Sequence, residues 1–345
     1  MQTLRRILAK EEIRPYVIAE ISANHGGALE NAKSLIMAAK NAGADAVKLQ
    51  TFTADTITVN SNETNFLIPD SSNLWGGRNL WSLMKEAETP LVWHEELFGY
   101  ANSLGLEVFS TAYDIDAAIF LEQSGIKAIK VSSFDLINIP LLDYLAKRDV
   151  LVIISTGMSK TTEINKASEI FTHKKSTTAF LQCTSSYPCS VQDVNINRHD
   201  LLKSFGFVTG YSDHTLDPTA AILAIGKGAL IFEKHITLMD INTLDSEFSM
   251  NEFQFKNYVE TIWNAFNALG DFDFSPTPSE TASLWERPSI IALTDIAIGE
   301  TLSRINIGIR RPSLGADPIF FNELINSPSE FSLRKGEGFP TPKIS

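Results

Sequence analysis

Short apolar runs alternate along the chain with longer segments whose apolar residues recur every three or four positions. The short runs are typical of buried parallel strands, and the longer pattern is typical of amphipathic helices. The helical pattern is clearest in segments 31–42, 115–123, 162–171 and 218–227. Eight strands are predicted, at 17–21, 46–52, 108–112, 128–133, 151–157, 178–184, 208–213 and 230–236.

Eight strand–helix units over residues 1–270 match the size of a TIM (β/α)8 barrel. A doubly wound open sheet is the alternative. A dinucleotide-binding sheet of that kind carries a GxGxxG turn after its first strand, whereas the turn here reads SANHGG. We therefore predict an α/β fold, with a TIM barrel in residues 1–270.

The pattern changes after the barrel. Residues 271–285 are rich in polar and turn-forming residues, which predicts a linker. Residues 286–345 hold short apolar runs separated by Gly, Asp and Pro, which predicts a small β-rich domain. Within the barrel, the long polar connections 53–90 and 185–197 are expected to shape a substrate site.

Composition and charge exclude several classes of protein. A formal net charge of −12 argues against a nucleic-acid binder, and no apolar run is long enough to span a membrane. The first residues lack the apolar core of a signal peptide, so we expect a cytoplasmic protein. Cys183 and Cys189 are the only cysteines and predict no disulfide framework. Cys183 lies inside a strand, where packing is the expected role.

Charged residues gather where the predicted strands end. In a TIM barrel that end carries the active site, and buried charge is costly unless it is paired or bound to a ligand. One such residue is more often structural, but several at the same end indicate a site. They include Glu20, Lys48, Gln50, Lys130, Glu233 and His235.

His214 and His235 follow the seventh and eighth strands. Two imidazoles at neighbouring strand ends can hold one divalent metal ion in an open site. Asp213 and Glu233 are expected to orient the two rings. A single buried histidine, by contrast, is more often a hydrogen-bonded core residue.

The other four histidines carry weaker signals. His25 follows the first strand, so it could belong to the site or be a hydrogen-bonded core residue. His94 begins a helix and is expected to be structural. His173 and His199 are expected to be exposed to solvent.

Two lysines supply positive charge for an anionic ligand. Lys48 and Lys130 can bind a phosphate and a carboxylate together with nearby hydroxyls. A strand-end lysine also fits a Schiff-base nucleophile, so the lysines alone leave both interpretations open. The hydroxyls belong to Thr111, Ser133, Ser155 and Ser212.

Several segments occur in the order found in the sialic acid synthase family. The stretches AEISANHGG, GADAVKLQTF, FSTAYD, KVSSFD, ISTGM, CTSSYP, GYSDHT and FEKHIT resemble that family. The tail SIIALTDIAIGETLSRINIGIRRPS resembles the antifreeze-like (SAF) domain that follows the barrel there. The stretches LWGGRNLW, LDSEFSM and RRPSLGADPIFFNEL most resemble the branch of the family that makes pseudaminic acid.

The resemblance implies a metal-dependent condensation of phosphoenolpyruvate with an amino-sugar aldehyde. The metal, Mn²⁺ or Mg²⁺, would be held by His214 and His235 and would polarise the aldehyde. Carbon 3 of phosphoenolpyruvate attacks the aldehyde, water adds at carbon 2, and phosphate leaves by C–O cleavage. The implied acceptor is a 2,4-diacetamido-2,4,6-trideoxy hexose of altrose type. Synthesis of N-acetylneuraminate or legionaminic acid by the same mechanism is the alternative.

The resemblance also implies roles for single residues. Glu20 and Gln50 would lie near the acceptor and the attacking water, and Glu233 would handle protons. Tyr187 and Asp245 would contact the acceptor. The implied contacts to phosphoenolpyruvate are Lys48, Thr111, Lys130, Ser133, Ser155 and Ser212.

Two further positions qualify the resemblance. Arg311 in the tail would reach the active site of the partner subunit, which implies a domain-swapped homodimer. Its neighbour Arg310 leaves that assignment ambiguous by one residue. The family pattern KxxSxE reads KVSSFD here, so Asp135 stands where the family has Glu, and its reach to the sugar is in question.

Two other classes of function compete with a synthase. A Schiff-base pyruvate aldolase on the same barrel gives no role to the histidine pair or to the tail. A non-catalytic carbohydrate-binding protein does not need the charged strand ends. The synthase interpretation accounts for all three features.

Overall fold

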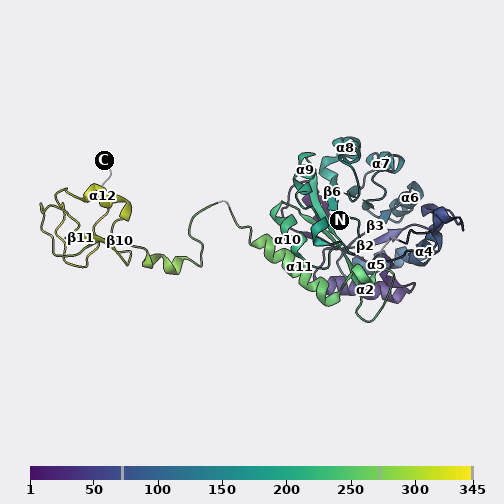
Figure 1. Cartoon of the computed structure of the whole chain (residues 1–345), viewed down its shortest axis with the longest axis horizontal. Coiled ribbons are helices and arrows are strands. Elements are labelled where there is room, and N and C mark those ends of the chain that lie inside the picture. Colours follow the sequence, from purple (N-terminus) through teal and green to yellow (C-terminus); the bar gives the residue numbers. More distant parts are fainter. Residues whose placement is uncertain (71–73, 272, 343–345) are drawn as a thin grey trace. The chain divides into compact units, whose positions relative to one another are not determined.

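The computed structural model describes residues 1–70, 74–271 and 273–342, and the chain divides into two compact units, Met1–Gly270 and Asp271–Ser345 (Figure 1). In the larger unit, helices form a ring around a central set of strands. The strands are β1 (Tyr16–Glu20), β2 (Ala46–Thr51), β3 (Glu107–Ala112), β4 (Ala128–Val131), β5 (Leu151–Ser155), β6 (Thr178–Cys183), β7 (Val208–Asp213) and β8 (Ile231–Thr237).

Each of these strands pairs in parallel with the next, and β1 also pairs in parallel with β8. This last pairing closes the sheet into a barrel, so the TIM-like fold is confirmed and the open doubly wound sheet is wrong. The predicted strand ends agree with the structure to within two residues. A short strand, β9 (Met250–Asn251), continues the sheet beside the end of β8.

The strands are buried on both faces because helices cover the outside of the barrel. Every residue of β1 and of β5 is buried, as expected for parallel strands. Several helices begin at capping side chains, such as Asp114, whose carboxylate accepts from the backbone N–H of Ala117. The outer helices are α2 (Leu29–Ala42), α5 (His94–Ser103), α6 (Ile115–Gln123), α7 (Ile139–Ala146), α8 (Thr161–Ile170), α9 (Arg198–Ser204), α10 (Thr219–Gly226) and α11 (Glu252–Asn267).

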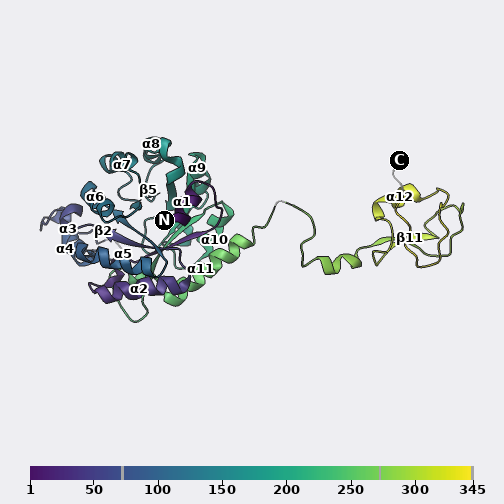
Figure 2. The ribbon, with the colours of Figure 1, turned by 180° about the vertical axis from the view of Figure 1, so that it is seen from behind.

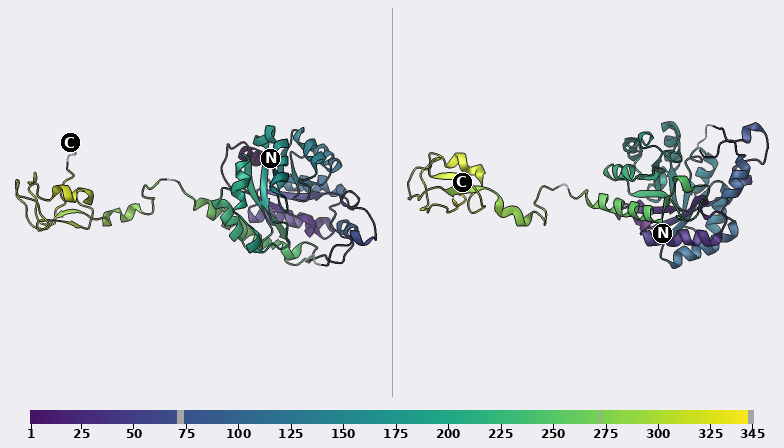
Figure 3. Two further views of the ribbon diagram at one scale, coloured as in Figure 1. Left: turned by 45° about the horizontal axis from the view of Figure 1, so that its top comes forward. Right: turned by 60° about the horizontal axis from the view of Figure 1, so that its bottom comes forward.

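The two ends of the barrel differ. Helix α1 (Gln2–Leu8) lies at the end where the strands begin, near the centre of the barrel in Figure 2. The backbone N–H of Thr3 and the hydroxyl of Tyr16 both donate to the carboxylate of Glu107 there, at 2.9 and 2.7 Å. The long connection after β2 carries α3 (Ala54–Ile57) and α4 (Leu80–Ala87), and its blue ribbon projects from the rim in Figure 3. The end where the strands finish is therefore the one shaped by long loops.

The smaller unit has its own apolar core. Strands β10 (Ser289–Ala292) and β11 (Ile307–Arg310) pair antiparallel, and the one-turn helix α12 (Phe321–Leu324) follows. Isolated bridges and turns make up much of the rest of its described part. Its core includes Ile290, Leu302, Ile307, Phe321 and Phe339. In the described parts of both units, no helix has the length and apolar character needed to cross a membrane.

Candidate active site

A cavity of about 720 Å³ opens at the carboxyl ends of the barrel strands. The register of the sheet explains how residues far apart in the sequence meet there. Each pair named below lies directly opposite across neighbouring strands, so the two side chains point to the same face of the sheet, the interior of the barrel. The pairs are Glu20–Lys48, Glu20–His235, Gln50–Thr111, Thr111–Lys130 and Ser212–Glu233.

The structure brings together nearly all residues that the sequence singled out. The exception is Arg311, which follows β11 in the smaller unit and has an exposed side chain. The residues that line the cavity are Glu20, Lys48, Gln50, Thr111, Lys130, Ser133, Asp135, Ser155, Tyr187, Ser212, His214, Glu233, His235 and Asp245.

The floor of the cavity is a buried cluster of ionic groups. The ammonium of Lys48 contacts the carboxylate of Glu20, donates to Thr111 Oγ1 at 2.8 Å and lies 3.8 Å from Glu233 Oε2. The ammonium of Lys130 lies 4.0 Å from Glu233 Oε1 and donates to the carbonyl of Val131 at 2.9 Å. Both lysines are almost fully buried.

Burial has a strong effect on the protonation of these groups. It lowers the pKa of Lys48 to about 7, although the charge of Glu233 acts in the opposite direction. For Glu233 burial raises the pKa, but the two lysines outweigh it, and its pKa lies below the usual range. The cluster therefore holds an ionised carboxylate beside a lysine that titrates near neutral pH.

The cluster also has binding capacity that its own contacts do not use. Among the described residues, Glu233 Oε2 and Ser155 Oγ are buried without a hydrogen-bond partner. Buried polar atoms in folded proteins are normally hydrogen-bonded, so unpaired ones in a cavity indicate a ligand. The lysines Lys48 and Lys130 are balanced by Glu20 and Glu233, so a ligand with two anionic groups needs additional positive charge.

The two strand-end histidines face each other in the cavity. The rings of His214 and His235 lie 5.5 Å apart between centroids. His214 Nδ1 lies 2.9 Å from the carbonyl of Thr184, and His235 Nδ1 lies 3.1 Å from Ser22 Oγ. In both rings Nε2 is thus the nitrogen left to bind a ligand.

The two histidines differ in their tendency to take up a proton. Burial, followed by the charges of His214 and Lys48, holds the pKa of His235 well below its usual range. For His214 burial lowers the pKa, but the neighbouring Cys183 and the carbonyl of Thr184 raise it more. His235 is therefore neutral at physiological pH, and neutral imidazole is the form that binds metals.

These residues fit a metal ion in an open site. Two imidazoles leave several coordination positions to water and substrate, as catalytic metal sites require. Across the residues that the structure describes, no group of three or more His, Cys, Asp or Glu side chains is placed to share an ion. A divalent ion held by His214 and His235 would supply the additional positive charge that an anionic ligand needs.

The prediction that Asp213 and Glu233 orient the two imidazoles is wrong. Asp213 does not contact the ring of His214, because its side chain points out of the barrel and accepts from the backbone N–H of Thr215 at 2.8 Å. Glu233 accepts from Ser212 at 3.0 Å rather than holding His235. The carbonyl of Thr184 and the hydroxyl of Ser22 take the places that the two acids were expected to fill.

Two acids near the mouth of the cavity have perturbed protonation. Burial raises the pKa of Asp135 to about 6, and Ser132 Oγ donates to its carboxylate at 2.5 Å. Burial also raises the pKa of Asp245, whose carboxylate accepts from the backbone N–H of Ala23 at 3.2 Å. Both positions suit a carboxylate that exchanges hydrogen bonds with a sugar.

Aromatic and apolar residues form the wall opposite the floor of the cavity; the sequence predicted Tyr187 and the role of the connection 53–90, but none of the wall's apolar residues. The ring of Tyr187 lies 4.3 Å from that of His214, and Phe248 lies 5.0 Å from His235 and 6.1 Å from Trp75. The connection after β2 supplies much of this wall, and helical spacing in LWSLMKEA was the signal that could have found part of it. The apolar lining comprises Phe52, Ile57, Ile68, Trp75, Leu80, Leu83, Met84, Ala87, Leu244 and Phe248.

Cys183 also belongs to the cavity. It was expected only to pack inside β6, yet it lines the cavity, and its Sγ lies 3.6 Å from His214 Nδ1. The loop after β5 approaches the loop after β4 closely at Gly157, whose backbone N–H donates to Ser133 Oγ at 3.0 Å. A Cβ at Gly157 would lie 2.2 Å from Ser185 Oγ, so this approach requires glycine.

The remaining histidines lie outside the cavity. His25 Nε2 lies 3.2 Å from Thr89 Oγ1, and buried His94 lies 2.8 Å from Thr51 Oγ1. His173 is exposed, as predicted. The exposure predicted for His199 is wrong, because α9 packs it against the barrel, where its Nε2 lies 2.9 Å from Thr209 Oγ1.

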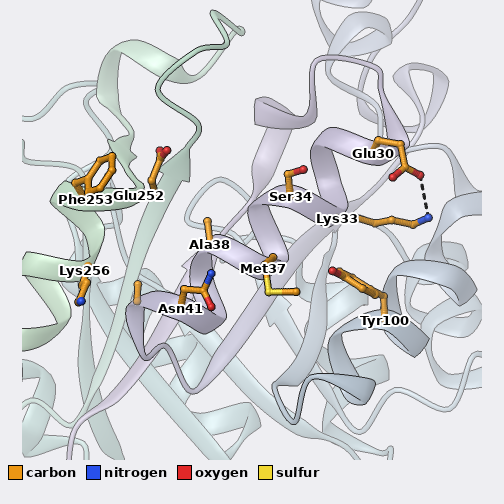
Figure 4. A pocket seen from close by; sticks show the side chains of 11 residues that line it. Glu30, Lys33, Ser34, Met37, Ala38, Asn41, Tyr100, Glu252, Phe253 and Lys256 are labelled. Carbon is orange, nitrogen blue, oxygen red and sulfur yellow. Dashed lines mark hydrogen bonds and ion pairs between the residues drawn. The ribbon is translucent and has the colours of Figure 1, made fainter.

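A second hollow, of about 680 Å³, lies on the outside of the barrel between α2, α5 and α11 (Figure 4). Its apolar surface comes from Met37, Tyr100 and Phe253, and Lys33 donates to Glu30 at 2.9 Å on its rim. None of the residues predicted for the site lines this hollow. The candidate site is therefore the cavity at the strand ends.

Known proteins share this chain's sequence and fold. The model of the NeuB family matches residues 35–273. Pseudaminic acid synthase from Campylobacter jejuni subsp. jejuni serotype O:2 is 36% identical over 325 residues, which cover 93% of this chain and 94% of that protein. N,N'-diacetyllegionaminic acid synthase from Legionella pneumophila subsp. pneumophila is 34% identical over 332 residues, which cover 93% and 92%.

Among solved structures, the chain resembles a crystal structure of N-acetylneuraminic acid (sialic acid) synthetase from Leptospira borgpetersenii serovar Hardjo-bovis in complex with citrate. The sequence identity is 30% and the TM-score is 0.69. The match covers 79% of this chain and 90% of that one.

Proposed function

Because the chain belongs to the NeuB family, we propose that it condenses phosphoenolpyruvate with a 2,4-diacetamido-2,4,6-trideoxy hexose of altrose type to give pseudaminic acid and phosphate. The observation that carries the proposal is the cavity in which a buried lysine–carboxylate cluster lies beside a pair of imidazoles. The lysines of the cluster would bind an anion, and the imidazole pair suits a metal ion. A condensation that starts from an anionic enol phosphate needs both.

Phosphoenolpyruvate binds at the floor of the cavity in this proposal. Lys48 and Lys130 turn from their carboxylate neighbours towards the phosphate and carboxylate of the substrate. The unpaired Ser155 Oγ then gains a partner, and so satisfies a buried polar atom. Thr111, Ser133 and Ser212 supply the other hydroxyl contacts.

His214 and His235 are the residues that would hold the divalent ion, Mn²⁺ or Mg²⁺, through Nε2 of each ring. When bound, this ion supplies Lewis-acid polarisation of the aldehyde oxygen of the acceptor. Thr184 and Ser22 fix the orientation of the two rings. The protein itself thus presets the geometry of the pair before any ligand arrives.

The reaction balances without a covalent enzyme intermediate. Carbon 3 of phosphoenolpyruvate forms a bond to the aldehyde carbon, and the aldehyde oxygen takes a proton to become a hydroxyl. A water molecule adds to carbon 2 and loses a proton. We assign Glu20 and Glu233, which line the cavity, as the bases that accept this proton, and Gln50 as the residue that orients the water. The C–O bond to phosphate then breaks as carbon 2 becomes a carbonyl. No lysine has to form a Schiff base.

The wall opposite the floor supports the choice of acceptor. The proposed acceptor carries two acetamido methyl groups and a methyl group at carbon 6, which gain free energy by leaving water. Trp75, Met84 and Phe248 offer apolar surface on the side of the cavity where the sugar would lie. Asp135, Tyr187 and Asp245 are the polar partners proposed for its hydroxyl and amide groups. The relative from Legionella pneumophila keeps N,N'-diacetyllegionaminic acid as the second candidate product.

The smaller unit has a proposed role in a homodimer. We assign it as an antifreeze-like domain, with 271–285 as a linker and Arg311 reaching the site of the partner subunit. The exposure of Arg311 leaves its guanidinium available for such a contact. The cytoplasmic location predicted from the sequence is part of the same proposal.

The test is phosphate release from phosphoenolpyruvate with Mn²⁺ and a panel of acceptors. The panel contains the altrose-type sugar, its stereoisomers including the manno-configured one, and N-acetylmannosamine. We expect release with the altrose-type sugar alone, and loss of release in EDTA. Release of phosphate with another isomer would change the assigned acceptor and leave the proposed mechanism standing. No release with any acceptor, combined with borohydride trapping of pyruvate, would replace the proposal by an aldolase.

A further inference from the structure

A fully buried lysine lies behind the candidate site and has no role in the proposed reaction. Lys234 has 0% of its surface exposed and stands on β8 between Glu233 and His235. Its two neighbours point into the cavity, so its own side chain points out of the barrel. Burial of an ammonium costs several kcal/mol unless it is well paired. A lysine at this position therefore needs a compensating role.

The contacts of Lys234 are unusual for a buried lysine. Within the part of the chain that the structure describes, its ammonium forms no ion pair of 4.0 Å or less, and the carboxylate of Asp213, its partner in the strand register, offsets its charge from farther away. The ammonium instead donates to two backbone carbonyls, that of Asp213 at 3.2 Å and that of Thr215 at closer range. These are the residues immediately before and after His214. The ring of Tyr258 on α11 lies 6.0 Å from the same ammonium.

The segment that Lys234 holds is a tight turn. The backbone N–H of Thr215 donates to Asp213 Oδ1 at 2.8 Å, and Thr215 Oγ1 lies 2.8 Å from the same oxygen. Thr215 Oγ1 also lies 2.7 Å from the carbonyl of Asp217. The side chain of Asp213 thus closes the turn through Thr215, and the ammonium of Lys234, opposite Asp213 in the strand register, binds two of the turn's carbonyls.

We propose that Lys234 is a positioning residue that fixes the turn Asp213–Thr215 so that the imidazole of His214 faces that of His235. Lys234 and His235 are consecutive on β8, so one strand carries one imidazole and also clamps the backbone that carries the other. In this proposal β8 helps to determine the distance between the two rings, because it carries both His235 and Lys234. This inference rests on the proposed metal site at His214 and His235.

The proposal has a physical reason. A site that binds a metal ion tightly must hold its ligands to within about 0.5 Å, and supporting contacts usually secure that precision. The ring of His214 is supported at Nδ1 by the carbonyl of Thr184 and by Cys183 Sγ, and it packs against the ring of Tyr187. His214 lies beyond the last residue of β7, and its own carbonyl accepts from the backbone N–H of Cys189 at 2.8 Å. The ammonium of Lys234 holds the carbonyls on either side of it and so completes the constraint on this backbone.

The experiment compares Mn²⁺ affinity in full-length proteins. Lys234→Met keeps the unbranched side chain and removes the ammonium, and free Mn²⁺ is titrated by electron paramagnetic resonance in the absence of substrates. We expect the Kd for Mn²⁺ to rise about 10- to 100-fold, the usual effect of removing a supporting contact. At saturating Mn²⁺ the KM for phosphoenolpyruvate should stay near the wild-type value, because the clamp does not touch the floor of the cavity.

Lys174→Met is the matched control. The ammonium of Lys174 also donates to two backbone carbonyls, those of Arg148 and Val150, but it lies outside the cavity, and its loss should leave the Kd for Mn²⁺ at the wild-type value. Should Lys234→Met fail to fold, Thr215→Val tests the same turn without disturbing a charge, and it should also weaken Mn²⁺ binding. Folded Lys234→Met, or Thr215→Val in its place, with wild-type Mn²⁺ affinity would overturn the inference.

The same titration separates this inference from the proposed function. Wild-type protein that binds no Mn²⁺ and keeps its activity in EDTA would refute the metal site itself, and the inference with it. Wild-type protein that binds Mn²⁺ through His214 and His235, with unchanged affinity in Lys234→Met, would refute the clamp alone.

Discussion

The rings of His214 and His235 lie 5.5 Å apart, and each already uses Nδ1 in a hydrogen bond within the protein. The partners of these bonds, a carbonyl and a hydroxyl, carry no charge. The pair therefore gains no negative charge from its supports, so a divalent ion held by the proposed pair would keep its charge available for the substrate. This arrangement favours a metal that activates an anionic or carbonyl oxygen over one that only stabilises the fold.

Removal of either imidazole should abolish metal binding. In His214→Ala and His235→Ala we expect phosphate release to fall by about 100-fold or more, since Lewis-acid assistance is worth several kcal/mol. Calorimetric titration with Mn²⁺ should show the parallel loss of binding. His173→Ala, at an exposed histidine outside the cavity, is the control and should behave as wild type. Full activity in both cavity variants would contradict the proposed metal site.

The low pKa of Lys48 predicts a pH dependence. In the proposed function the ammonium form binds the anionic substrate, and burial lowers the pKa of this group to about 7 in the free enzyme. Below that pH Lys48 is protonated and binding is complete, whereas above it the competent fraction falls tenfold per pH unit. The value of kcat/KM for phosphoenolpyruvate should therefore fall from about pH 7 upwards, while kcat changes less.

Lys48→Met separates this effect from other titrations. The variant should lose about 10- to 100-fold in kcat/KM for phosphoenolpyruvate, the cost of one charge-assisted hydrogen bond. It should also lose the descending limb of the profile near neutral pH. If wild type kept a flat kcat/KM from pH 6 to 9, or if the limb persisted unchanged in Lys48→Met, Lys48 would not be the group that titrates.

The sequence predicted the barrel and the floor of the cavity for the same reason. Buried parallel strands appear as continuous apolar runs, so a charged residue at the end of such a run stands out, as Lys48 and Glu233 do. Closure of the sheet then brings these ends together, and the register places Glu20 opposite both Lys48 and His235. The period of the apolar residues and the position of each charged residue along its strand were sufficient to predict the barrel and the floor of the cavity.

Other features depend on information that spacing does not contain. Asp213 follows Ser212 in β7, and the alternation of the strand turns it out of the barrel, away from the ring that it was expected to support. His199 lies on α9, a helix of 7 residues, too short for its buried face to be read from periodicity. The apolar wall comes largely from a long connection without regular period, so only the fold could assemble it.

The proposed homodimer leads to a complementation experiment. Arg311→Ala and His235→Ala chains should each be inactive alone, because one lacks the arginine supplied in trans and the other lacks a cavity imidazole. After mixing under conditions where subunits exchange, a mixed dimer contains one site with both intact residues. Activity should then recover to about a quarter of wild type, if half of the dimers are mixed and each has one intact site.

Arg310→Ala is the matched control for that experiment, since it removes the neighbouring guanidinium of the same strand end. It should keep activity on its own. Recovery by Arg310→Ala chains but not by Arg311→Ala chains would reassign the arginine by one position. No recovery with verified subunit exchange would contradict the domain-swapped arrangement.

The apolar wall should determine which acceptor the cavity selects. Trp75 is partly buried at this wall, with its ring 6.1 Å from that of Phe248, and it lies on the connection that projects from the rim. In Trp75→Ala we expect the KM for the trideoxy acceptor to rise about tenfold, because one lost apolar contact costs 1–3 kcal/mol. The KM for phosphoenolpyruvate should change little, since the contacts proposed for it lie on the opposite, polar floor.

The more specific outcome concerns discrimination between acceptors. A sugar with a hydroxymethyl group at carbon 6 should lose less from Trp75→Ala than a sugar with a methyl group, so the ratio of their kcat/KM values should move towards one. Trp285→Ala, at an exposed tryptophan of the smaller unit, should leave that ratio unchanged. If Trp75→Ala lowered kcat/KM equally for both acceptors, the wall would contribute to binding without selecting the sugar, and the polar residues Asp135 and Asp245 would carry the selection instead.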